Sequence, residues 1–173
     1  MNKHTIIVIT ASVVIAATFV FSALNIYAAE QIQFVGNEKA GFSYFNMINN
    51  HQLSVCNSLP FYVALSKINM IMVFDKKEIG IYRIQDVVLS PFTISNIKGN
   101  FKSENFDEAQ YYAFQFDGEF SESIPIRIDS MKFSIISEID TPIIGIIPYT
   151  VNKQYSGQEF WNMMNEKNGK VSC

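Results

Sequence analysis

The N-terminal part of the chain differs sharply from the rest in its hydrophobic pattern. Residues 5–29 contain no charged side chain and are apolar on every side of a helix rather than along one stripe. About 20 such residues, at 1.5 Å each, cross the hydrocarbon core of a bilayer, which is roughly 30 Å thick. Residues 1–29 are therefore predicted to be a transmembrane signal anchor.

The charges that flank this segment indicate its orientation. Lys3 and His4 precede the apolar run, and the first charge after it is Glu30. Positive charge tends to stay in the cytoplasm, so we expect a single-pass protein with a cytoplasmic N-terminus and an extracytoplasmic domain. The alternative is secretion after cleavage at Tyr27-Ala28-Ala29, which resembles a signal-peptidase site, but the apolar run exceeds the usual 7–15 residues.

After this segment the pattern changes to period two, which is typical of strands. Residues 30–41 are polar, include two glycines, and are interpreted as a linker. Ile68, Met70, Met72 and Phe74 then share one face of a predicted strand. The strand candidates are residues 42–48, 52–57, 61–65, 68–74, 79–84, 87–89, 94–101, 124–128, 132–139 and 143–149. The first two flank Asn49-Asn50-His51, which predicts a hairpin.

Two capping boxes predict helices. Asn105 precedes Glu108 by three residues and opens a helix expected to reach about residue 116, while Ser156 and Glu159 open a short C-terminal helix. Many short strands with few helices indicate a mainly β protein, a β-sandwich over residues 42–150. Residues 151–173 form the expected C-terminal extension with its short amphipathic helix.

One segment of the body resembles a known family. Residues 53–61 read LSVCNSLPF, in which Asn57, Pro60 and Phe61 match the Asn-Pro-x-Pro-Phe signature of the LEA14-like, or water-stress and hypersensitive-response (WHy), domain; Ser58 replaces the first proline. The resemblance covers about residues 43–140. It implies a fibronectin-III-like β-sandwich, often carried on an N-terminal membrane segment, associated with stress and desiccation tolerance, and without catalytic residues.

Composition and motifs argue against several functions. The net charge of −3 supplies no basic surface for nucleic acid. The chain has only two histidines, His4 and His51, and no Cys or His pair with ligand spacing, so we expect no metal and no cofactor. No nucleophile motif or phosphate loop is present. The chain is therefore expected not to be an enzyme.

The two cysteines, Cys56 and Cys173, both lie in the part expected outside the cytoplasm. An oxidising exterior allows them to pair, and a bridge would hold down a C-terminus that otherwise frays. The alternative is two separate thiols, one buried and one free. We expect Cys56 and Cys173 to form a disulfide bond.

Two apolar clusters are candidate partner contacts, because one small sandwich does not readily cover both. They comprise Ile143, Ile144, Ile146, Ile147, Phe160, Trp161, Met163 and Met164. For the C-terminal helix, capping of the sandwich is the preferred interpretation and docking on a partner the second, since a helix lying on a membrane surface usually has a more basic polar face. The leading hypothesis is a non-enzymatic, membrane-anchored domain that acts through contacts with other membrane or envelope proteins, as an accessory subunit of a complex. The alternatives are a lipid- or small-ligand-binding module, with an apolar pocket between the sheets, and a stress-protective envelope protein.

Overall fold

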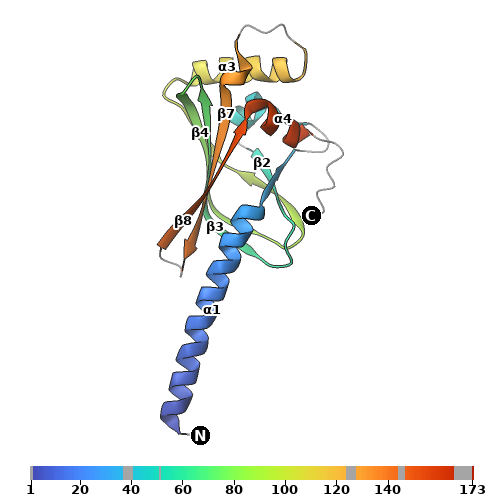
Figure 1. Cartoon of the computed structure of the whole chain (residues 1–173). Coiled ribbons are helices and arrows are strands. Elements are labelled where there is room, and N and C mark those ends of the chain that lie inside the picture. Colours follow the sequence, from blue (N-terminus) through green and yellow to red (C-terminus); the bar gives the residue numbers. More distant parts are fainter. Residues whose placement is uncertain (1, 37–40, 51, 124–127, 144–146, 166–172) are drawn as a thin grey trace.

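The computed structural model describes residues 2–36, 41–50, 52–123, 128–143, 147–165 and 173. The protein is mainly β, as the sequence predicts: two antiparallel sheets are accompanied by short helices and preceded by one long apolar helix. Helix α1 leaves one end of the domain and helix α3 lies across the other end (Figure 1). We call these the anchor end and the distal end.

The larger sheet has five strands in the order β6-β4-β3-β7-β8. Its strands are β3 (Val63–Phe74), β4 (Lys77–Leu89), β6 (Asn100–Lys102), β7 (Phe133–Ile143) and β8 (Ile147–Ser156). Strand β3 unites two of the expected strands, and β4 unites two more. Asp75 and Lys76 have positive φ and form the tight turn between them. The strand expected at residues 124–128 lies almost wholly outside the described residues.

The smaller sheet has the order β1-β2-β5 and contains β1 (Gln33–Val35), β2 (Gln52–Asn57) and β5 (Thr93–Lys98). Strand β1 pairs with β2, so the segment interpreted as a linker contributes a strand to the domain. The predicted hairpin before β2 is wrong: Tyr44–Asn50 forms helix α2. This helix is capped by a residue distant in sequence, as described below, and no local pattern reveals that contact.

The helices differ in their surroundings. Helix α1 (Lys3–Gln31) is exposed over most of its length. Helix α3 (Phe106–Phe120) is one turn longer than expected, and the side chain of its cap, Asn105, accepts from the Glu108 amide at 3.2 Å as the capping box predicts. The second box is also confirmed at the start of α4 (Gly157–Asn165), where the Glu159 amide donates to Ser156 Oγ at 3.1 Å.

The core lies between the two sheets and is closed by helices. Strand β7 alternates strictly between buried and half-buried positions over most of its length, as expected for a sheet with one covered face. Met70 and Met72 of β3, Val55 of β2 and Phe116 of α3 belong to one buried cluster. The last turns of α1 join the same cluster, and this contact places the anchor within the fold.

Candidate functional site

At its junction with the domain, the C-terminal part of α1 is buried along one face of the helix. Ser22, Asn25, Ala28 and Ala29 lie on one face of the helix, at the helical spacing, and each is at most 3% exposed. This face packs on β7, β3 and β8. Small side chains allow the helix backbone to approach the sheet closely. The helix therefore enters the domain and continues its core.

Polar contacts fix the helix in this position. Asn25 Oδ1 accepts from the Ala64 amide at 3.0 Å, at the start of β3. Lys153 Nζ of β8 donates to the backbone oxygens of Glu30 at 2.6 Å and of Ile32 at 3.4 Å. A lysine at these carbonyls complements the negative end of the helix dipole. Burial lowers the pKa of Lys153, and the neighbouring Glu30 carboxylate opposes that shift.

The tripeptide that resembles a cleavage site lies inside this junction. Ala28 and Ala29 are fully buried and helical, whereas Tyr27 is half exposed. In the folded domain this tripeptide therefore belongs to the helical junction and is not part of an extended, exposed segment. Among the described residues, α1 alone is long and apolar enough to cross a membrane, with a mean hydropathy of 2.5 in its most apolar window.

The expected disulfide is present. Cys56 and Cys173 are bonded, with their Cα atoms 5.9 Å apart and 117 residues apart in sequence. Cys56 is buried in β2, the central strand of the small sheet. The bond therefore ties the last residue of the chain to the middle of the domain and is consistent with an oxidising compartment.

The candidate partner contacts are divided by the structure. Phe160 and Met164 are buried in the core, and Trp161 and Met163 are half-buried against it, so the C-terminal helix caps the domain. Phe160 packs against Tyr44, whose hydroxyl donates to the Gly157 oxygen at 2.8 Å. Phe160 and Trp161 therefore pack within the fold and expose little surface to a partner.

The second candidate cluster lies at the anchor end. Ile147 is 56% exposed and Ile143 is half-buried, and the two residues pair across β7 and β8. Ile144 and Ile146 lie outside the described residues. The structure therefore places Ile147 on the surface beside α1 and separates it from the buried Phe160.

A cluster of exposed aromatic residues occupies the distal end, and the sequence analysis missed it. Phe114 and Tyr111 of α3 are half exposed, and the Phe114 ring meets that of Phe45 of α2, 37% exposed, edge-on at 6.3 Å. We call Phe45, Tyr111 and Phe114 the distal aromatic surface. The i, i+3 spacing of Tyr111 and Phe114 was the available signal, but helix orientation was needed to interpret it.

Asp117 of α3 holds the two helices of this surface together. Its Oδ1 accepts from the Tyr44 amide at 2.8 Å, while Oδ2 accepts from the Phe45 amide at 2.8 Å and from Ser43 Oγ at 2.7 Å. The Tyr44 and Phe45 amides belong to the first turn of α2, where backbone N–H groups have no partner within the helix. Burial raises the pKa of Asp117 despite these hydrogen bonds.

Asn57 organises the anchor end. Its Oδ1 accepts from the Leu59 amide at 3.1 Å and closes a turn at the end of β2. Its Nδ2 donates to the oxygens of Phe61 at 2.9 Å and Ser90 at 3.0 Å, which joins the β2–β3 and β4–β5 connections. Asn57 is 1% exposed, and Phe61 is partly buried against the core.

Two further features bear on chemistry. A depression of about 270 Å³ at the β4–β6 edge is lined by Glu78, Ile81, Arg83, Lys102, Ser103 and Glu104. Five of these six residues have polar or charged side chains, and Ile81 is the apolar one. Within the described part of the chain, no three His, Cys, Asp or Glu side chains are grouped closely enough to hold a metal ion.

Comparison with known proteins does not assign a family. No family model matches the sequence, and no curated protein matches it. Among solved structures, the chain is similar to one described as a protein from Archaeoglobus fulgidus, with 8% identity and a TM-score of 0.28 over 62% of this chain and 86% of that chain. Such a distant likeness carries no argument about function, and the resemblance to the LEA14-like domain stays a prediction.

Proposed function

We propose that this protein is an uncleaved, single-pass membrane protein whose domain lies outside the cytoplasm and acts, without catalysis, by binding another protein of the same membrane. The observation that carries the proposal is the buried junction of α1. Because the helix enters the core without a flexible segment, the domain stands at a fixed height and orientation. A rigid connection between the helix and the domain suits a protein that presents a surface to a partner.

The orientation is supported by two independent features. Lys3 precedes the anchor, and the next charge, Glu30, follows it. The Cys56–Cys173 bond favours an oxidising exterior for the domain. Together they support a cytoplasmic N-terminus and an extracytoplasmic domain.

The surface proposed for the partner is the distal aromatic surface. Phe45, Tyr111 and Phe114 are large, exposed and held on two helices that Asp117 fixes together. Aromatic side chains that are exposed on a rigid support are typical centres of protein interfaces. The surface lies on α2 and α3, at the end of the domain opposite α1 (Figure 1). Lipid or small-ligand binding and stress protection remain predictions.

The test combines native electrophoresis of gently solubilised membranes with matched variants. We expect the wild-type chain, 19.7 kDa with its N-terminus intact, to migrate in a larger band with defined companions. Tyr111→Ala with Phe114→Ala should release it from that band, whereas the exposed control Lys98→Ala on β5 should not. Migration of the wild type as a free chain, or equal behaviour of both variants, contradicts the proposal.

A further inference from the structure

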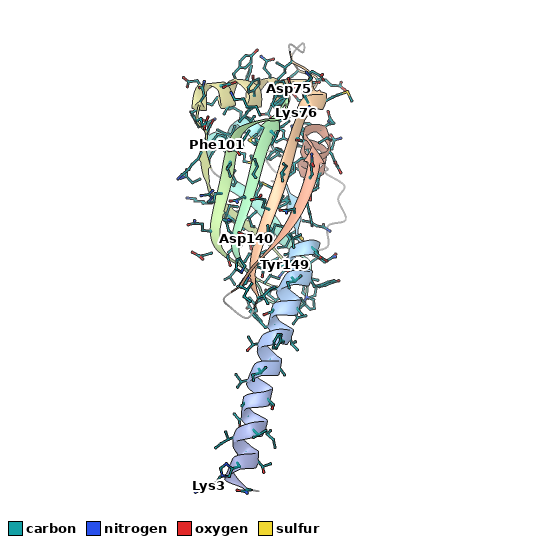
Figure 2. All side chains as sticks on the ribbon, turned by 60° about the vertical axis from the view of Figure 1, so that its left-hand side comes forward. Lys3, Asp75, Lys76, Phe101, Asp140 and Tyr149 are labelled. Atoms are coloured by element: carbon teal, nitrogen blue, oxygen red, sulfur yellow. A yellow bond between two sulfur atoms is a disulfide. The ribbon has the colours of Figure 1, made fainter. Side chains whose placement is uncertain are left out.

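Charged residues are distributed unevenly between the two ends of the domain. Three segments, residues 57–66, 87–97 and 141–152, contain no Asp, Glu, Lys, Arg or His, although 17% of the chain is charged. By contrast, the distal connections carry Asp75, Lys76, Glu104 and Asp107. Figure 2 shows Asp75 and Lys76 at the distal end and Tyr149 at the other, beside α1.

The structure places the described residues of these three segments toward the anchor end. Ala64 in the first segment donates its amide to Asn25 of α1, and its oxygen accepts from Thr141 Oγ1 at 3.5 Å. The Phe92 amide donates to the Leu59 oxygen at 3.3 Å. The first segment therefore meets α1 where it leaves the domain, and the second and third segments are each bonded to the first.

Large apolar side chains at this end face outward instead of into the core. Tyr62 is 63% exposed and Phe92 is 56% exposed; Ile147 and Tyr149 are also exposed. We call these four residues the anchor-end rim. Phe92 has φ of +50°, an uncommon conformation for a bulky residue, so the fold holds this ring outward at a conformational cost.

The length of the anchor indicates how near the membrane this rim stands. Burial in the domain begins at Ser22, which leaves residues 5–21 as the free apolar part of α1. At 1.5 Å per residue this part is about 25 Å long, shorter than a hydrocarbon core of roughly 30 Å. A full crossing therefore draws the anchor end of the domain down to the lipid surface.

We propose that the anchor-end rim is a second membrane contact, in which Tyr62, Phe92, Ile147 and Tyr149 lie in the boundary between lipid headgroups and acyl chains. This inference rests on the proposed membrane anchorage. Aromatic residues with a polar tip favour that boundary. Few charges lie near the rim, and Asp140, which accepts a hydrogen bond from Thr150 next to Tyr149, is paired with Lys67 at 2.8 Å. This pairing lowers the cost of bringing the two ions close to lipid. The continuity of the rim with α1 selects lipid, and not a protein partner, as its occupant.

The test measures the depth of single tryptophans in full-length protein reconstituted into phosphatidylcholine vesicles. In a Trp161→Phe background, Phe92→Trp and Tyr62→Trp report on the rim, Phe114→Trp is the exposed distal control, and Phe19→Trp reports on the anchor. Lipids brominated near the glycerol end of their acyl chains should quench most of the emission of both rim variants. They should leave the distal control unquenched.

The anchor variant separates the failure of this inference from the failure of the proposed function. If Phe19→Trp is quenched while both rim variants are quenched no more than Phe114→Trp, the domain stands clear of the lipid and the second contact is overturned. If Phe19→Trp also escapes quenching, α1 does not lie in the bilayer, and the membrane anchorage is overturned together with the rim contact.

Discussion

Among single residues, Asp117 has the most consequential contacts, because it caps a helix to which it does not belong. Replacing it in Asp117→Ala removes the acceptors for three donors at the start of α2, including the buried Tyr44. Loss of such a cap costs about 1–2 kcal/mol. We expect a denaturant titration in detergent, followed by the emission of Trp161, to show this loss. An unchanged midpoint would mean that α2 does not depend on this cap.

The raised pKa of Asp117 gives the same residue a pH signature. Because burial raises the pKa of Asp117 in the folded state above the ordinary aspartate value of 3.8, the folded protein binds this proton more tightly than the unfolded chain. Protonation of Asp117 therefore stabilises the folded state. This stabilisation is fully present below pH 3.8 and is lost as pH rises through the folded-state pKa. As pH falls from neutrality, the unfolding free energy of the wild type should therefore rise relative to that of Asp117→Asn, which has no proton to bind at this position. A pH-independent difference would contradict the raised pKa.

At the scale of elements, α1 has an exposed part and a part buried in the domain, which truncation distinguishes. A chain starting at Ser22 keeps the buried face, whereas a chain starting at Ile32 removes Ser22, Asn25, Ala28 and Ala29 from the core. The shorter chain should be less stable by roughly 3 kcal/mol or more, because it leaves a groove where the helix packed. Urea titrations of both chains measure this difference. Equal midpoints would show that the junction contributes nothing to the fold.

The elements also show how far sequence reasoning reaches. Both capping boxes and the period-two strands were predictable, because their signals lie within a few residues. Helix α2 was not, because its cap comes from Asp117, some 70 residues away. The capping role of the C-terminal helix was the preferred interpretation, but the pattern alone left partner docking open, because an amphipathic helix has the same pattern whether it covers its own domain or a partner. The distal aromatic surface could not be predicted either, because the sequence does not show which side of α3 faces solvent.

For the whole molecule, the disulfide links the last residue to the centre of the small sheet. Loop-entropy models credit a closure of this length with about 4–5 kcal/mol as an upper value. Cys173→Ser should therefore lower the unfolding free energy by up to that amount, and reduction of the wild type with dithiothreitol should reproduce the loss. The variant itself should be insensitive to the reductant. Identical titrations for oxidised and reduced wild type would contradict a stabilising role.

The same bond reports on which side of the membrane the domain stands, because thiols pair stably only in an oxidising compartment. In intact cells treated with a permeant alkylating reagent before lysis, Cys56 and Cys173 should escape modification until they are reduced. Two introduced cysteines provide the control in a Cys56→Ser, Cys173→Ser background. An impermeant maleimide should label Lys98→Cys on β5 but not Asn2→Cys ahead of the anchor. The opposite labelling would invert the proposed orientation, and the distal aromatic surface would then face cytoplasmic partners.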